Sequence, residues 1–144
     1  MPRVSSRRML LSDIDSAGIA YTGRLITIAM ETLELGLAQV GLDFAAIIRE
    51  GRFGVPLVHV EADFKRPFRH GDMVDLHLFC DEIGTRSYTC RVELRPEGGA
   101  TASATLRFTA AVIDMASFTS VPVPDAFRAA LTSIIQPGTP PPAR

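Results

Sequence analysis

The chain has 144 residues, of which 47% are hydrophobic and 22% charged, and its formal net charge is −1. This balance predicts one packed domain, and the near-neutral charge argues against a nucleic-acid-binding protein. The basic N-terminal residues contain no apolar run of signal-peptide length, and no segment approaches the roughly 18 apolar residues of a membrane span, so we expect a cytoplasmic protein without a membrane segment.

The first half of the chain is predicted to hold a short strand, an irregular loop and two helices. A strand signal covers residues 5–12, and the turn-rich segment 13–23 follows, where Asp, Ser and Gly favour local backbone bonding. Apolar residues cover most of a helical wheel from Arg24 to Val40, which predicts a mostly buried helix. A second, short helix is predicted from Asp43 to Arg49, closed by Gly51.

The second half alternates with a period of two residues, which is typical of strands in an antiparallel meander. The predicted strands are Leu57–Phe64, Met73–Ile83, Ser87–Leu94 and Ala102–Ile113, with turns near Gly84 and at Gly98-Gly99. A short helix is predicted from Asp125 to Ile134. We therefore expect one domain over residues 1–135 and a proline-rich, disordered tail over residues 136–144.

One long apolar helix followed by four or five antiparallel strands is best packed by curling the sheet around the helix, so the fold class is predicted to be an α+β roll. Such a sheet leaves an edge strand open, which favours a dimer. The two cysteines, Cys80 and Cys90, give neither a disulfide framework nor a zinc-ligand set, and we expect both to be reduced.

The segment between Asp13 and Gly23 carries the strongest chemical signal in the sequence. Asp13 and Asp15 lie just before a helix start, where free N–H groups and the helix dipole stabilise an anion. A carboxylate and helix-start N–H groups that face one point would serve acyl transfer. An Asp in this position is by itself more often a helix cap or turn former. Magnesium binding is the other alternative, but no third ligand is recognisable and we expect no metal.

The chain carries a wider set of motifs: Asp13-x-Asp15-x-Ala17-Gly18-Ile19-x-Tyr21, the buried helix after it, Gly54-Val-Pro-Leu-Val58, and Arg66-Pro67 followed by Gly71-Asp72. Together these motifs resemble the 4-hydroxybenzoyl-CoA thioesterase family of hotdog proteins. The resemblance spans about residues 9–113 and implies a hotdog fold, an antiparallel sheet curled around one long buried helix.

The resemblance also implies roles for individual residues. Asp15 matches the family's catalytic carboxylate, whereas Asp13 matches a more structural one. A backbone N–H at the helix start, that of Thr22 or Gly23, would hold the thioester carbonyl. Tyr21 would line the substrate pocket, and Gly18 belongs to the same motif.

Coenzyme A would bring phosphates to the protein surface, and four basic side chains near predicted strand ends are candidate partners. They are Lys65, Arg66, Arg69 and Arg86. Ser87 follows the hairpin turn where the family often has a serine near the thioester. Any single one of the four basic residues also fits a solvated basic turn.

The expected activity is hydrolysis of an acyl-CoA thioester to a free acid and coenzyme A, without a further cofactor. Many members of the family have an Asn and a second aromatic residue at the helix start, whereas this chain has Thr22-Gly23-Arg24-Leu25. This departure leaves the acyl group open, including an aromatic one such as 4-hydroxybenzoyl. The alternatives are a non-catalytic acyl-CoA-binding protein and a hotdog dehydratase or hydratase. We expect a homodimer or a tetramer of such dimers.

Overall fold

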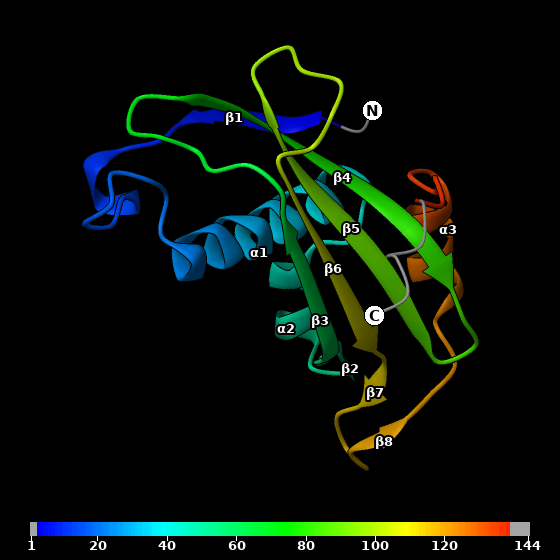
Figure 1. Ribbon diagram of the computed structural model, residues 1–144. Coiled ribbons are helices and arrows are strands. Elements are labelled where there is room, and N and C mark those ends of the chain that lie inside the picture. Colours follow the sequence, from blue (N-terminus) through cyan, green and yellow to red (C-terminus); the bar gives the residue numbers. More distant parts are fainter. Residues whose placement is uncertain (1–2, 139–144) are drawn as a thin grey trace.

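The computed structural model describes residues 3–138. Its main sheet contains five antiparallel strands in the order β1-β4-β5-β6-β3, and a small sheet has the order β2-β7-β8 (Figure 1). The strands are β1 (Arg3–Arg8), β2 (Phe53–Gly54), β3 (Leu57–Phe64), β4 (Met73–Ile83), β5 (Ser87–Pro96), β6 (Ala104–Ala111), β7 (Ile113–Asp114) and β8 (Thr119–Ser120). The helices are the 3-10 turn η1 (Leu11–Asp13), α1 (Thr22–Gln39), α2 (Phe44–Glu50) and α3 (Asp125–Thr132).

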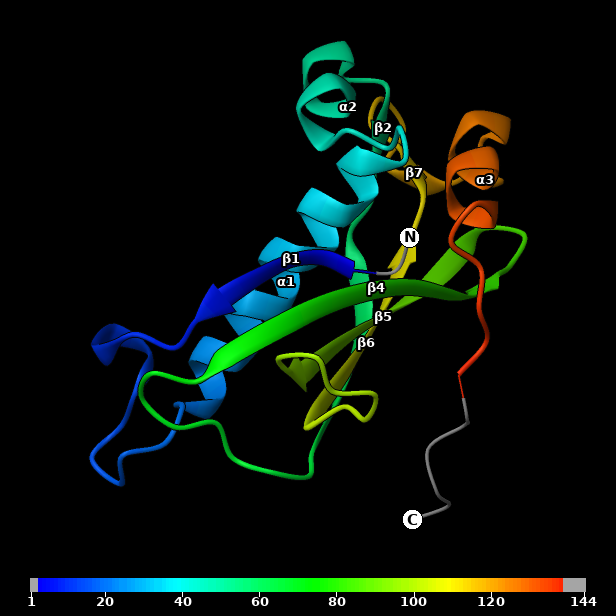
Figure 2. The same ribbon diagram turned by 90° about the horizontal axis from the view of Figure 1, so that it is seen from above.

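The sheet wraps around α1, and all three α-helices lie on the same side of it (Figure 2). Leu25, Ile28 and Leu37 of α1 are buried against the inward-facing residues of β4, β5 and β6. Gly36 permits this close approach, because a Cβ at this position would lie 2.5 Å from Cδ2 of Leu78 and 2.8 Å from Cγ2 of Val4. The predicted α+β roll around one long helix is therefore confirmed.

Both ends of α2 follow the expected capping chemistry. Asp43 accepts a hydrogen bond from the Ala45 N–H at 3.0 Å, and Gly51 closes α2 in the left-handed conformation at φ 67°.

Within the described residues, no single helix has both the length and the apolarity to cross a membrane; α1 and α2 reach both criteria only as a pair, which bends by 80°.

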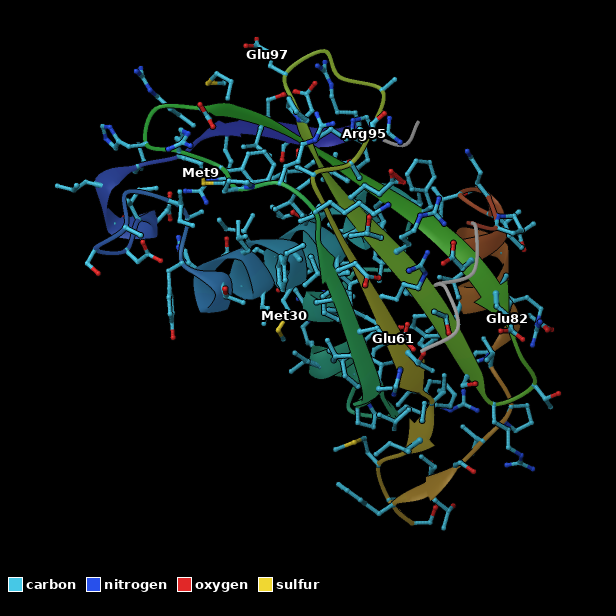
Figure 3. The ribbon with its side chains drawn as sticks, in the orientation of Figure 1. Met9, Met30, Glu61, Glu82, Arg95 and Glu97 are labelled. Atoms are coloured by element: carbon cyan, nitrogen blue, oxygen red, sulfur yellow. The ribbon has the colours of Figure 1, made fainter. Side chains whose placement is uncertain are left out.

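One side of the core is left uncovered in the single chain. α1 packs on β1, β4 and β5, so the inward face of the edge strand β3 remains half open. Val60 and Phe64 of β3 are 46% and 43% exposed, and Met30 of α1 is 46% exposed. Met30 points away from the core into the space beside β3 (Figure 3). The helix that was expected to be mostly buried thus keeps an exposed apolar stripe.

The outer face of the sheet is polar but largely closed to solvent. Arg91 is 5% exposed, contacts Asp81 and Glu93, and lies over the Phe79 ring with 4.4 Å from its Cζ to the ring centroid. The segment after α3 closes over this region, since the N–H of Gly138 donates to Asp81 at 3.0 Å.

The same segment pairs with the exposed edge of β4. The N–H of Cys80 donates to the carbonyl of Ile134, and that of Gln136 donates to the carbonyl of Cys80, both at 2.8 Å. Cys80 and Cys90 face each other across β4 and β5 as free, buried cysteines, as expected. Residues 139–144 of the expected tail lie outside the described residues.

Two of the predicted strands end earlier than expected. The first strand ends at Arg8 instead of residue 12, because Leu10 and Asp13 close η1 through an N–H to carbonyl bond of 2.9 Å. The long final strand breaks at Val112, where the chain leaves the main sheet. There β7 pairs with β2 and β8, two short strands that were not predicted.

Candidate active site

The segment between η1 and α1 is a short hairpin with a defined turn. Ile14 pairs with Ala20 at its neck, and the Asp15 N–H donates to the Ile19 carbonyl at 2.9 Å. The Gly18 N–H donates a hydrogen bond to the Asp15 carbonyl at 3.1 Å, and Gly18 itself has φ 78°. A turn followed by a left-handed residue is a common three-residue hairpin loop, and the left-handed position favours glycine. The motif therefore builds a specific loop.

Asp15 stands at the base of this turn with its carboxylate in solvent. Its Oδ1 accepts the Ala17 N–H at 2.8 Å, a local bond that fixes the rotamer. In the part of the chain that the structure describes, no hydrogen bond to Oδ2 is present. An oriented carboxylate with one free oxygen can accept a proton from water or attack an electrophilic carbon.

Free backbone donors follow the loop at the start of α1. Thr22 and Gly23 occupy the first two helical positions, where a helix supplies no acceptor for the N–H groups. The Tyr21 ring lies over this turn and is 59% exposed. A Cβ on Gly23 would lie 2.7 Å from Cε1 of Tyr21, so glycine keeps the ring close to the helix start.

Asp13 is a buried anion that joins three elements. Its side chain is 0% exposed; Oδ2 accepts from Arg7 Nη2 and from the Leu10 N–H, each at 2.8 Å, and Oδ1 accepts from Arg24 Nε at 2.7 Å. Burial raises the pKa of the Asp13 carboxyl, but the hydrogen bond from Arg24 and the other donors outweigh burial, so the net pKa is lowered. The hydrogen bond to Asp13 in turn raises the pKa of Arg24.

Asp13→Asn is expected to lower the free energy of unfolding at pH 7 by about 3 kcal/mol, because it removes the anion that pairs with two guanidinium groups. The lowered pKa means that this stabilisation is complete above about pH 4 and is lost as the pH falls through the folded-state pKa. Urea unfolding of both proteins between pH 7 and pH 3 measures the difference. If the difference in the free energy of unfolding between wild type and Asp13→Asn stayed constant down to pH 3, this would contradict the role of Asp13 as a stabilising anion.

The loop is fastened to the segment that joins β3 to β4. Ile19 pairs with Arg69, and the Ala20 N–H donates to the Phe68 carbonyl at 2.8 Å. Arg69 therefore lies beside the Asp15 loop. Arg66 is exposed and lines a hollow of ≈ 490 Å³ with Glu97 and Asp72, on the side of the buried Phe68 that faces the β5–β6 turn.

Arg86 and Ser87 lie at the opposite end of the sheet. Ser87 pairs with Ala111 at the end of β6, whereas the Asp15 loop is attached beyond the Phe64 end of β3, which pairs with Ala104. These ends are separated by about 23 Å of strand. Arg86 Nη1 donates to the Ser120 carbonyl at 2.7 Å. Within one chain, the structure brings together Asp15, Gly18, Tyr21, Thr22, Gly23 and Arg69, but it does not bring Arg86 and Ser87 to them.

Sequence reasoning missed the arginine contacts of Asp13. Arg7 was assigned only to a basic strand and Arg24 only to a departure from the family pattern. A buried Asp needs cationic partners, but these are six and eleven residues away, and no local pattern indicates such a spacing. Among residues 3–138, no group of three or more His, Cys, Asp or Glu side chains is arranged to hold a metal ion.

Comparisons with known proteins fit this geometry. Residues 9–131 match the model of the thioesterase-like superfamily. A 1,4-dihydroxy-2-naphthoyl-CoA hydrolase of Picosynechococcus sp. is 35% identical over 82 residues, which are 57% of this chain and 56% of that protein. The chain thus matches just over half the length of that relative.

Two solved structures match almost the whole chain. The crystal structure of a 1,4-dihydroxy-2-naphthoyl-CoA thioesterase from Synechocystis has a TM-score of 0.81 and 26% identity, covering 92% of this chain and 97% of that one. A thioesterase superfamily protein from Jannaschia sp. CCS1 has a TM-score of 0.81 and 29% identity, and 92% of each chain is covered. These matches confirm the predicted hotdog fold.

Proposed function

Because the chain belongs to the thioesterase-like superfamily, we propose that it hydrolyses an acyl-CoA thioester to the free acid and coenzyme A. The observation that carries this proposal is the geometry of the Asp13–Gly23 segment. A solvent-exposed carboxylate is held in a rigid hairpin that leads directly into the free N–H groups of a helix start.

In the proposed reaction, Asp15 acts on the thioester carbonyl either directly or through water. As a general base it takes a proton from water, and the hydroxyl adds to the carbonyl carbon. The N–H groups of Thr22 and Gly23 hold the negative charge that develops on oxygen. Collapse of the tetrahedral species breaks the C–S bond, and the coenzyme A thiolate leaves and takes up the proton. As a nucleophile, the Asp15 carboxylate adds to the carbonyl carbon, the C–S bond breaks and the coenzyme A thiolate leaves. Water then hydrolyses the acyl anhydride to the free acid, which restores the Asp15 carboxylate and supplies the proton that the thiolate takes up.

The working unit is proposed to be a homodimer that pairs β3 with the β3 of a second copy. This strand forms one edge of the sheet, and Val58, Val60 and Phe64 on it are 61%, 46% and 43% exposed. An edge strand of eight residues that carries exposed apolar side chains is a template for pairing with another chain. The partner would also cover Met30 of α1.

This pairing explains why the expected site residues lie at two ends of one chain. In a two-fold antiparallel pairing, the Leu57 end of one β3 lies beside the Phe64 end of the other. The partner's Arg86 and the partner's Ser87 would then approach the Asp15 loop. Arg66 and Arg69 from one chain and the partner's Arg86 are the proposed contacts for the phosphates of coenzyme A.

The proposed substrate is an aromatic acyl-CoA. Two observations support an aromatic acyl group: relatives of this chain are named as hydrolases of 1,4-dihydroxy-2-naphthoyl-CoA, and the exposed Tyr21 ring lies next to the proposed oxyanion donors. A flat acyl group can stack on such a ring, which contributes about 0.5–1.5 kcal/mol beyond the buried area.

The test is release of free thiol from a panel of CoA esters, followed with a thiol-reactive dye. The panel contains 1,4-dihydroxy-2-naphthoyl-, 4-hydroxybenzoyl-, benzoyl-, hexanoyl- and palmitoyl-CoA. We expect kcat/KM for the aromatic esters to exceed that for the straight-chain esters by roughly 2- to 10-fold, the factor that about 0.5–1.4 kcal/mol of differential binding produces. Both cysteines are buried, so they should contribute little background.

The other outcomes are equally informative. Binding of these esters without thiol release would identify a non-catalytic acyl-CoA-binding protein. Hydration or dehydration of an enoyl or hydroxyacyl ester, read from the absorbance of the conjugated product, would identify the hydratase alternative. A preference for straight-chain esters would keep the thioesterase and reject the aromatic substrate.

A further inference from the structure

We infer that Arg24 is a positioning residue of the site, and that its ion pair with Asp13 fixes the Asp15 carboxylate relative to the N–H groups of Thr22 and Gly23. This inference rests on the proposed function, because it concerns the same site. Arg24 itself need not contact the substrate.

The catalytic carboxylate and the oxyanion donors lie on two different structural elements. Asp15 belongs to the hairpin, whereas Thr22 and Gly23 begin α1. Arg24 is the third residue of that helix, one position after Gly23. Its guanidinium Nε reaches back 2.7 Å to Oδ1 of Asp13, two residues before Asp15.

A second contact joins the same two elements through the backbone. The Tyr21 N–H donates to the Asp13 carbonyl at 2.8 Å. One hydrogen bond allows the hairpin to pivot about it, whereas a backbone contact and a side-chain contact together fix both distance and orientation. Asp13 is fully buried, and its carboxylate accepts three hydrogen bonds, from the side chains of Arg7 and Arg24 and from the Leu10 N–H, so it is a rigid anchor for Arg24.

Arg24 has a weaker contact on its other side. Its Nη1 lies 3.9 Å from Oε1 of Glu31, two turns further along α1, and the Glu31 side chain is 58% exposed. An exposed ion pair at this distance contributes little, so the 2.7 Å hydrogen bond to Asp13 sets the position of the guanidinium. A guanidinium bound in this way to a buried carboxylate is better suited to fixing a geometry than to binding a mobile ligand.

Arg7 provides a matched control within the same cluster. It donates to the other oxygen of Asp13 at 2.8 Å, and its side chain is 23% exposed. Arg7 lies on β1, which carries neither the carboxylate nor the proposed donors. Loss of either arginine removes one charged donor from Asp13, but only the loss of Arg24 releases the helix start from the loop.

The test compares Arg24→Gln, Arg7→Gln and the wild type in the full-length protein. For each, kcat and KM are measured on the panel ester that the wild type hydrolyses with the highest kcat/KM. Both variants are expected to lower Tm by similar amounts. Arg24→Gln is expected to lower kcat by on the order of 10- to 100-fold with KM within about two-fold, the penalty of a misplacement near 1 Å. Arg7→Gln is expected to retain kcat within about three-fold, and Arg24→Lys, which keeps a cationic donor, should recover part of the loss.

Equal kcat values for Arg24→Gln and Arg7→Gln would overturn the inference, and so would an effect on KM alone, which indicates direct substrate binding. If Arg24→Gln does not fold, the comparison of Arg24→Lys with Arg7→Lys decides by the same criteria. Failure of the inference is distinct from failure of the proposed function. In the first case wild-type turnover persists, whereas in the second the wild type releases no thiol from any ester.

Discussion

Asp15→Asn is expected to lower kcat for thioester hydrolysis by roughly 10³-fold, because an amide neither accepts a proton from water at neutral pH nor attacks a thioester. The structure predicts little change in folding. Asp15 is exposed, and the amide oxygen of Asn can still accept the Ala17 N–H that orients the side chain. Thiol release under saturating ester gives kcat, and thermal unfolding checks the fold.

Asp43→Asn is the control for this substitution. Asp43 is also exposed and also accepts the N–H of the residue two positions on, here Ala45 at 3.0 Å, but it caps α2 away from the loop. Asn is an equally good cap, so both stability and turnover should be retained. Retained turnover in Asp15→Asn would reject the catalytic assignment, and a parallel loss in Asp43→Asn would show that the substitution acts through structure.

Activity is expected to return when Asp15→Asn chains are combined with Arg86→Glu chains. Charge reversal at Arg86 should raise KM by about 10- to 100-fold, because an anion would then face the phosphates of coenzyme A. In a mixed dimer, one of the two sites takes Asp15 from one chain and Arg86 from the other, so one site is intact. A mixed dimer should therefore show about half the wild-type turnover at low substrate concentration.

Two affinity tags on the two variants allow the mixed dimer to be isolated from co-expression. The control carries Asp15→Asn under both tags and should stay inactive. Mixed dimers that show only the summed activities of the two parent variants would place the whole site within one chain. A monomeric mass in light scattering would reject the dimer and with it the shared site.

The elements with a strong hydrophobic period were predictable from the sequence. The helix expected from Arg24 begins at Thr22, and β3 and β4 have the expected limits, because buried stripes dictate both kinds of element. The turn at Gly18 and the cap at Gly51 also followed from the residue types, since both take a positive φ.

The missed features depend on contacts between distant residues. The break at Val112 arises because β7 pairs with β2, and a two-residue strand such as Phe53–Gly54 has no readable period. The burial of the Asp13 carboxylate likewise depends on how β1 and α1 pack together, and so do its contacts with Arg7 and Arg24. Ser87 was expected near the thioester and Arg86 near the phosphates of coenzyme A. Both lie at the far end of the sheet from the Asp15 loop, because β3 pairs with β6, a strand order that the sequence pattern does not indicate.

The two edges of the main sheet are unequal, and this limits how far the molecule can assemble. At one edge β1 carries Arg3, Arg7 and Arg8, and the backbone of β4 beyond it is taken up by the bonds of Cys80 to residues 134 and 136. Charged residues and occupied backbone groups discourage a further strand. Among the strands of the main sheet in residues 3–138, only β3 forms an edge with exposed apolar side chains. A molecule with one strand edge available for pairing can bind one further copy through that edge. Association through strands therefore yields a dimer and no fibre.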